Sequence, residues 1–178
     1  SYCATCDGAF FRNKTAAVVG GGDVAVEDAI FLSRICEKVC LIHRRDSLRA
    51  AKSLQDTLFQ CRNVEILWDS VVEEICGQEK VEFLKLRRLK EERTVELPVD
   101  GVFIAVGIRP NTEMLQNIVT YDEGGYIIAG EDCVTQTPGI FAAGDVRTKQ
   151  LRQIVTAVAD GANAVVSVEK YFRERENG

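Results

Sequence analysis

Short apolar runs separated by helical patterns shape the first part of the chain. Thr15 to Val19, Lys38 to Ile42 and Val64 to Leu67 are such runs, and short apolar runs bounded by turns are typical of buried parallel strands. Asp23 to Ile35 lies between the first two runs and carries apolar residues at helical spacing. The pattern predicts an α/β domain built on one parallel sheet.

A second helix is predicted between the second and third strands. Asp46 can cap its start, because an aspartate side chain accepts hydrogen bonds from the first turn of a helix. The apolar residues that follow lie on one side of this helix, near a period of about 3.6 residues. They are Leu48, Ala51, Leu54 and Leu58.

The pattern changes after the third strand. Val71 to Leu97 contains β-like runs separated by charged turns, which predicts a small antiparallel excursion inserted in the domain. Val102 to Val106 returns to a buried parallel-type strand, which Gly107 to Pro110 closes. We therefore expect a first domain over residues 1–110.

The last part of the chain, residues 111–178, is sparser in regular structure. Tyr126 to Ile128 and Ile140 to Ala142 are predicted as short strands, and Leu151 to Tyr171 as a long apolar helix. These elements are too few to close a core alone. We therefore expect this segment to be part of a larger domain.

Composition and charge narrow the class of protein. The chain has 178 residues, of which 46% are hydrophobic and 28% charged, a mixture typical of a soluble globular protein. The net charge of -5 argues against sequence-independent nucleic-acid binding. No apolar run approaches the roughly 20 residues of a membrane helix. A basic cluster in the excursion is expected to be a solvated sheet face: Lys85, Arg87, Arg88, Lys90 and Arg93.

The seven cysteines are irregularly spaced, which argues against a secreted disulfide framework and favours a reducing cytoplasm. Most of them replace small apolar residues in helix or strand patterns, and we expect those thiols to be inert. Cys3 and Cys6 stand apart from these patterns. Because the chain starts at Ser1 and its first residues already form this motif, we expect the start to be a cut end.

A glycine-rich turn joins the first strand to the first helix. Residues 20–25, Gly-Gly-Gly-Asp-Val-Ala, fit G-x-G-x-x-A in the strand–turn–helix context that a dinucleotide site requires. Glycine lets the backbone approach a pyrophosphate, and the helix N-terminus offers unpaired N–H groups. Gly20, Gly22, Asp23 and Val24 are therefore candidate cofactor-binding residues.

The end of the second strand distinguishes between the two nicotinamide cofactors. An NAD site places an acid near this point, whereas this chain has His43, Arg44 and Arg45, with Arg49 four residues further on. If a helix begins near Asp46, Arg45 and Arg49 share one of its faces. Guanidinium groups bind a 2′-phosphate through paired charge-assisted hydrogen bonds, so we expect NADPH. His43 is the single histidine and is expected to lie beside the ribose phosphate, not to act as a base.

Cys3 and Cys6 form a Cys-x-x-Cys pair next to the α/β pattern. The spacing lets a disulfide open and close with little backbone change, and a following helix N-terminus lowers a thiolate pKa. Asp7 comes directly afterwards and can move a proton. Half a zinc site is one alternative, but no second pair completes four ligands, so no metal is expected. A purely structural pair is the other alternative.

Five segments together resemble low-molecular-weight thioredoxin reductases, which belong to the pyridine nucleotide-disulfide oxidoreductases. They are residues 2–8 (Tyr-Cys-Ala-Thr-Cys-Asp-Gly), 20–23 (Gly-Gly-Gly-Asp), 43–46 (His-Arg-Arg-Asp), 139–145 (Gly-Ile-Phe-Ala-Ala-Gly-Asp) and 152–154 (Arg-Gln-Ile). The resemblance covers essentially the whole chain, in order.

The resemblance implies an electron path with two cofactors and a protein partner. NADPH would reduce FAD, FAD would reduce the Cys3–Cys6 disulfide with Cys6 nearer the flavin, and the dithiol would reduce thioredoxin. Asp7 resembles the general acid of the family, and a homodimer is implied. Implied NADPH contacts are Gly22, Asp23, His43, Arg44, Arg45 and Arg49. Implied FAD contacts are Gly144, Asp145, Arg152, Gln153 and Ile154.

The family begins with a separate FAD-binding half that has its own G-x-G-x-x-G, and this half is absent here. The expected organisation is an NADPH-binding domain with the redox motif over residues 1–110, and the C-terminal part of a split FAD-binding domain over residues 111–178. Two alternatives stay open. The chain could be an NADP(H)-binding module without flavin or activity, or it could belong to the related peroxiredoxin reductases, which typically prefer NADH and lack the His-Arg-Arg cluster.

Overall fold

The computed structural model describes residues 1–176 and divides into two compact units. The first is Ser1–Gly107 and the second begins at Ile108. Each unit is described by itself below.

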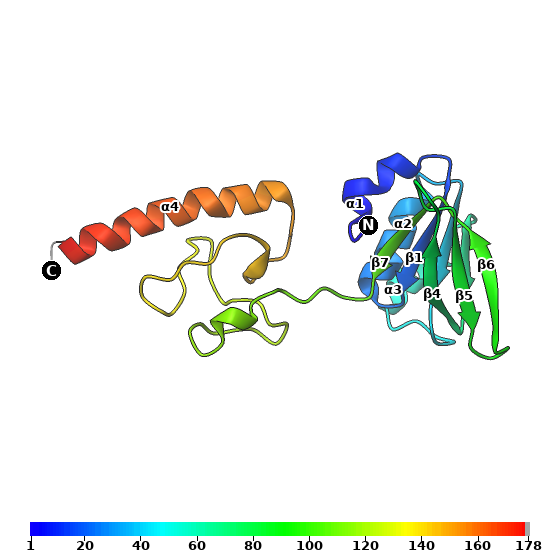
Figure 1. Cartoon of the computed structure of the whole chain (residues 1–178). Helices are drawn as coiled ribbons and strands as arrows, with labels where there is room; N and C mark the ends of the chain where they lie inside the picture. The colour runs from blue at the N-terminus through cyan, green and yellow to red at the C-terminus, as the bar shows by residue number, and fades with distance from the viewer. Residues whose placement is uncertain (177–178) are drawn as a thin grey trace. The chain divides into compact units, whose positions relative to one another are not determined.

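A four-stranded parallel sheet is the centre of the first unit (Figure 1). Its strand order is β3-β2-β1-β7, and every neighbouring pair is parallel. The strands are β1 (Thr15–Gly20), β2 (Lys38–Ile42), β3 (Val64–Leu67) and β7 (Gly101–Ala105). The predicted α/β class and parallel sheet are confirmed, and β2 and β3 have the predicted bounds.

Two helices cover one face of this sheet: α2 (Asp23–Ser33) and α3 (Lys52–Leu58). They share a buried core with the strands, in which Val26 and Leu32 of α2 lie among Val18, Leu41 and Phe103 of the sheet. Burial of these side chains supplies most of the free energy that holds helix to sheet, at about 25 cal/mol for each Å² of apolar surface removed from water.

A three-stranded antiparallel sheet covers the other face of the parallel sheet (Figure 1). Its strands are β4 (Ser70–Cys76), β5 (Phe83–Arg88) and β6 (Arg93–Pro98). Leu84 and Leu86 of β5 are buried against Ala17, Cys40 and Ile42. The predicted antiparallel excursion is therefore confirmed, and it covers one face of the parallel sheet.

The basic cluster lies on this antiparallel sheet, and four of its five side chains pair with acids, whereas Arg88 donates to the Ser70 hydroxyl. Lys85 meets Glu74, and Lys90 meets Asp69. Arg93 meets Glu91. These pairs are solvent-exposed, so each contributes at most about 1 kcal/mol to stability.

The second predicted helix begins later than expected. Its start at Asp46 is wrong, because α3 begins at Lys52 and residues 43–51 form a loop without regular structure. The backbone groups of this loop bond to other parts of the unit instead of to one another. Those bonds are described with the site below.

The N-terminal segment packs on the edge of the first unit. A single helical turn, α1 (Ala4–Asp7), leads into the 3₁₀ turn η1 (Gly8–Phe11), and Ala4 and Gly8 are buried. The Ser1 ammonium group donates to the Val102 carbonyl at 2.8 Å, and the Ile104 N–H donates to the Ser1 carbonyl at 2.8 Å. The segment therefore runs beside β7.

The second unit contains two 3₁₀ turns and one long helix. These are η2 (Glu113–Leu115), η3 (Gly144–Val146) and α4 (Ile154–Glu176). The strands predicted at Tyr126 to Ile128 and Ile140 to Ala142 are wrong: in the described residues these segments form only isolated β-bridges, because no neighbouring strand extends the pairing. The predicted helix is present, but it begins at Ile154 instead of Leu151.

A small core of Val119, Ile127, Ala129 and Ala142 holds the second unit together. The apolar side chains of α4 are largely outside that core and exposed: Ile154, Val155, Val158, Val165, Val166 and Phe172. These side chains are thus not covered by the described residues of their own unit. None of the helices in residues 1–176 is long and apolar enough to span a membrane.

Candidate functional site

The glycine turn lies at the carboxyl edge of the parallel sheet, between β1 and α2. A Cβ at Gly20 would overlap the Ala105 carbonyl oxygen and the Cβ of Ala25, so this position has room only for glycine. A Cβ at Gly21 would overlap the His43 ring. Gly22 differs from both, because nothing lies within 4 Å of the place its Cβ would take. The turn is closed on its inner side and open at Gly22, which fits the approach of a pyrophosphate.

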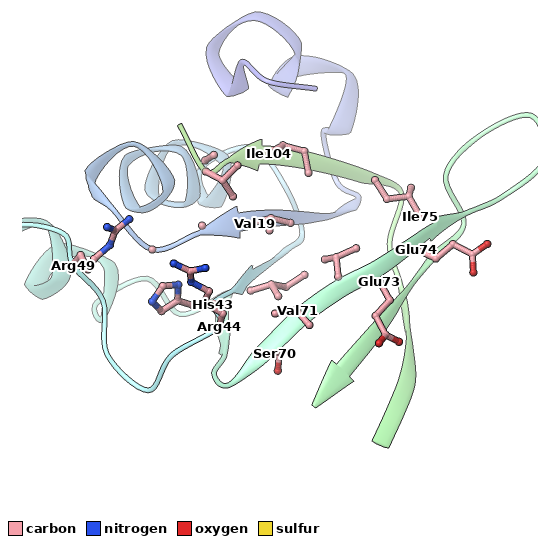
Figure 2. A pocket seen from close by; sticks show the side chains of 16 residues that line it. Val19, His43, Arg44, Arg49, Ser70, Val71, Glu73, Glu74, Ile75 and Ile104 are labelled. Carbon is pink, nitrogen blue, oxygen red and sulfur yellow. The ribbon is translucent and has the colours of Figure 1, made fainter. Parts of the chain in front are cut away.

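A cavity of about 530 Å³ opens beside this turn (Figure 2). Residues from the ends of β1, β2 and β7 line it, together with residues of β4. Ligands of α/β proteins bind at this edge, outside the carboxyl ends of the strands. Four predicted site residues line it, namely Gly20, His43, Arg44 and Arg49, and so does Gly21 of the same turn. The predicted Gly22, Asp23, Val24 and Arg45 are outside its lining, and the last three are exposed.

His43 is buried beneath the turn and contacts it directly. Its ring Nε2 lies 3.0 Å from the Ser47 carbonyl oxygen, and the ring packs edge-on near Trp68 with 6.3 Å between centroids. Burial lowers the pKa of His43, and the positive charges of Arg45 and Arg49 add to that effect. The His43 ring therefore supports the glycine turn by contact, and its predicted place beside a ribose phosphate stays a prediction.

The loop over residues 43–51 carries the arginines. The prediction that Arg45 and Arg49 share a helical face is wrong, because the loop is not helical. Arg44 and Arg49 instead both line the cavity, as Figure 2 shows, and Arg45 is exposed outside it. None of the three forms an ion pair within residues 1–176. Two guanidinium groups without a negative partner therefore face the same space as the glycine turn.

The sequence reasoning missed the contribution of β4. Ser70 to Ile75 line the cavity, and Ser70 is almost fully buried. The register of β4 against β5 shifts between Val72 and Glu74, and such bulges turn side chains toward neighbouring sites. A bulge inside an antiparallel excursion leaves no sequence pattern that would have pointed to the cavity.

Cys3 and Cys6 are joined by a disulfide, with 5.3 Å between their Cα atoms. Asp7 accepts a 2.6 Å hydrogen bond from the Ser1 hydroxyl. The pair is outside the lining of the 530 Å³ cavity. Its neighbours Ser1 and Tyr2 line a second cavity of about 540 Å³, which shares Ile75 and Ile104 with the first. Ile75 and Ile104 thus line both the cavity beside the redox pair and the cavity beside the glycine turn.

The remaining predicted residues lie in the second unit, around the turn from Gly144 to Ile154. Gly144 has a φ of +82°, which favours glycine, and its N–H donates to Asp160 at 2.8 Å. Asp145 is exposed. The Arg152 guanidinium lies 3.7 Å from the Tyr126 ring centroid and contacts the Asp145 carbonyl through Nε. Gln153 and Ile154 lead into α4.

Asp160 organises this turn and was missed by the sequence reasoning. Its two oxygens accept hydrogen bonds from the Gly144 N–H, Arg147 and Lys149 at 2.7 to 2.8 Å. The side chains of Asp160, Arg147 and Lys149 are all buried. The Arg147 guanidinium is the main reason that the pKa of Asp160 is held well below its usual range. An acid inside an apolar helix is the one sequence signal that could have drawn attention to it.

The other cysteines are free, and Cys36, Cys40 and Cys133 are buried. Burial raises the pKa of these three thiols, which keeps them protonated and unreactive. Within residues 1–176 no cluster of histidine, cysteine and acidic side chains is arranged to hold a metal ion.

Comparison with known proteins connects this arrangement to a family. The sequence profile of the family described as "Pyridine nucleotide-disulphide oxidoreductase" matches residues 1–161. A thioredoxin reductase of Listeria monocytogenes is 51% identical over 98% of this chain and 55% of its own length. One from Peptoclostridium acidaminophilum is 44% identical over 96% of this chain and 56% of its own length.

Solved structures give the same likeness. The crystal structure of thioredoxin reductase from Streptococcus pyogenes matches with a TM-score of 0.92 and 49% identity, over 98% of this chain and 57% of that one. Thioredoxin reductase from Giardia duodenalis matches with a TM-score of 0.83 and 35% identity, over 97% and 57%. The chain thus spans little more than half the length of the relatives that it matches.

Proposed function

This chain belongs to the pyridine nucleotide-disulphide oxidoreductase family, and we propose that it supplies the NADPH site and the redox disulfide of an NADPH-dependent thioredoxin reductase. The whole enzyme would reduce the disulfide of thioredoxin through FAD and the Cys3–Cys6 pair. The observation that carries the proposal is that Gly20 and Gly21 of the glycine turn line one cavity together with Arg44 and Arg49.

The arginines favour NADPH over NADH on electrostatic grounds. A 2′-phosphate is the only group that distinguishes the two reduced cofactors. Its negative charge would pair with Arg44 and Arg49, which form no ion pair within residues 1–176. Hydrogen bonds to charged groups contribute roughly 1.5–3 kcal/mol each, enough for a tenfold or larger preference. The pyrophosphate would lie at Gly22 and the N-terminus of α2, whose unpaired N–H groups and dipole favour an anion.

Cys3 and Cys6 would exchange electrons with the partner by thiol–disulfide exchange. In that reaction one thiolate of the reduced pair attacks the thioredoxin disulfide, and the second thiol then resolves the mixed disulfide. The pair returns to its disulfide form, and thioredoxin gains two electrons and two protons. Asp7, whose carboxylate accepts a hydrogen bond from the Ser1 hydroxyl, would hold a proton for this exchange.

The second unit would contribute to the flavin site. Its turn fits that role because Gly144 presents a backbone without a side chain, Asp145 is exposed for hydrogen bonding, and Arg152 is fixed against Tyr126. Gln153 and Ile154 would complete this edge. FAD, when bound, supplies the two-electron relay between nicotinamide and disulfide. We also propose that the whole enzyme is a homodimer, and that it works in the cytoplasm, where the free thiols stay reduced.

Calorimetric titration of the chain with NADPH and with NADH tests the proposed preference for NADPH. We expect NADPH to bind at least tenfold tighter, and Arg44→Ala and Arg49→Ala each to weaken NADPH about tenfold while changing NADH little. Arg62→Ala is the matched control, because Arg62 is exposed just before β3, at the amino edge of the sheet. Equal affinity for the two cofactors would overturn the proposal of an NADPH site.

The redox part is tested by the spectrum and turnover of the protein. A yellow chain with stoichiometric FAD, and thiols at Cys3 and Cys6 that appear on addition of NADPH, would support the reductase. A colourless chain that still prefers NADPH would instead identify an NADP(H)-binding module without activity. Reduction of a peroxiredoxin in the absence of thioredoxin would favour the peroxiredoxin reductase alternative.

A further inference from the structure

Two hydrogen bonds join the glycine turn to the arginine-bearing loop. The Asp23 carboxylate accepts the Ala51 N–H through Oδ1 at 2.7 Å. The Gly21 carbonyl accepts the Arg49 N–H at 2.7 Å. Both acceptors belong to the turn, and both donors belong to the loop. The position of the loop relative to the turn is therefore fixed by these contacts and not by regular secondary structure.

The first part of the loop is held by residues 67–70: the His43 N–H donates to the Leu67 carbonyl, and the Ser70 and Asp69 N–H groups donate to the carbonyls on either side of Arg44. The part that carries Arg49 has fewer such bonds. Leu48 and Ala50 are buried in the core against α2, which anchors the loop from below. Arg49 lies between them and is exposed toward the cavity. A backbone of alternating buried and exposed residues without ladder hydrogen bonds can shift easily. The Ala51 N–H is the last backbone donor before α3, so its partner sets where the loop ends.

We propose that Asp23 is a positioning residue that gives this site its preference for the phosphorylated dinucleotide, an inference that rests on the proposed NADPH site. Asp23 does so by fixing the end of the loop and thereby the Arg49 guanidinium group. It does not act by contact with the 2′-phosphate, because a carboxylate repels that group. Its role is specific to NADPH, since NADH has no phosphate for the arginines to bind.

The hydrogen bond from Ala51 to Asp23 favours NADPH binding, whereas the negative charge of Asp23 opposes the binding of both dinucleotides. Asp23 is in the first turn of α2, where the helix dipole stabilises its carboxylate but would also attract the pyrophosphate. The negative charge therefore weakens both dinucleotides alike, whereas the hydrogen bond to Ala51 strengthens NADPH alone. Asp23→Asn separates the effects, because an asparagine keeps the Oδ1 acceptor and removes the charge. Asp23→Ala removes both.

The test is the ratio of NADPH to NADH affinity, measured by calorimetric titration of the full chain. For Asp23→Ala we expect this ratio to fall about tenfold. For Asp23→Asn we expect it to stay within about twofold of the wild-type ratio, with both affinities equal or higher. Glu27→Ala is the matched control, since it removes one exposed carboxylate from the same helix and should leave the ratio unchanged.

Ala51→Pro tests the same hydrogen bond from the donor side, and decides the matter if Asp23→Ala does not fold. Proline fits the Ala51 φ of -54° and removes the N–H, so the ratio should again fall about tenfold. An unchanged ratio in the folded Asp23→Ala or Ala51→Pro chain, or an equal fall in Glu27→Ala, would overturn the inference alone. A wild-type chain without NADPH preference would overturn the proposed site and this inference together.

Discussion

The buried carboxylate of Asp160 predicts a large loss in the free energy of unfolding of the second unit when it is removed. In Asp160→Ala, Arg147 and Lys149 would lose their negative partner while their side chains are only 7% and 8% exposed. Leaving a buried charge without its partner costs roughly 3–5 kcal/mol. The Gly144 N–H would lose its acceptor as well. We therefore expect a loss of about 4 kcal/mol in the free energy of unfolding of this unit, a large part of the total stability of a typical domain.

Urea denaturation followed by circular dichroism measures this loss, because α4, with 23 residues, supplies about half of the α-helical residues that the structure describes. The single tryptophan is Trp68, in the first unit, so its fluorescence reports that unit separately and should not change. Glu169→Ala removes an exposed acid from the same helix and is the matched control. A loss below about 1 kcal/mol in Asp160→Ala, or the same loss in the control, would refute the reasoning.

The same prediction has a pH dependence with a definite sign. Because Arg147 holds the pKa of Asp160 below its unfolded value of 3.8, the carboxylate stabilises the folded unit fully above that value. The stabilisation is lost as the pH falls below it, when the unfolded chain takes up the proton first. The difference in stability between wild type and Asp160→Ala should therefore be constant from pH 5 to 7 and shrink on acidification below about 3.8.

Two further substitutions concern the first unit. Burial, and then the charge of Glu27, raises the pKa of Asp28 to about 6. The Asp28 carboxylate therefore destabilises the folded unit above that pH. This penalty disappears as the pH falls and the folded state binds the proton. Asp28→Asn should thus stabilise the unit by about 1 kcal/mol at pH 7.5, after allowance for its half-exposed position, and by nothing at pH 4; equal gains in urea melts at both pH values would contradict this. Gly101→Ala should lower stability by roughly 1–3 kcal/mol, because its Cβ would overlap the Phe11 ring, which packs edge-on against Phe103. An unchanged thermal midpoint would show that the ring can move aside freely.

The central sheet could be predicted from the sequence because its strands are short, apolar and bounded by turns. The loop before α3 could not. Leu48 is buried as its helical spacing suggests, yet the backbone around it is not helical. In the predicted helix the Arg49 N–H would bond to the Asp46 cap and the Ala51 N–H to a carbonyl one turn earlier. They bond instead to Gly21 and Asp23. A hydrophobic period reports which side chains are buried, and says nothing about tertiary partners that compete for the backbone.

The candidate site shows the same limit. The turn and the arginines were recognisable because a dinucleotide requires particular residue types at particular points of a β-α-β sequence. Ser70 was not, because it reaches the cavity through a strand that crosses from the other sheet. Asp160 was not, because its partners Arg147 and Lys149 become neighbours only when the turn folds back on α4. Long-range pairing of this kind leaves no local pattern.

The pairing of β1 with β7 has a consequence in time. Ala16 pairs with Gly101 in the sheet, so β1 can complete its pairing only after β7, which lies much later in the chain, has been synthesised. The N-terminal segment depends on that same strand, since the Ser1 ammonium group bonds to Val102, 101 residues further along the chain. Contacts between such distant residues form slowly, because the entropy of closing the intervening chain is lost before the contact is gained. The segment that carries the cysteine pair therefore takes its place on the sheet only after β7 has formed.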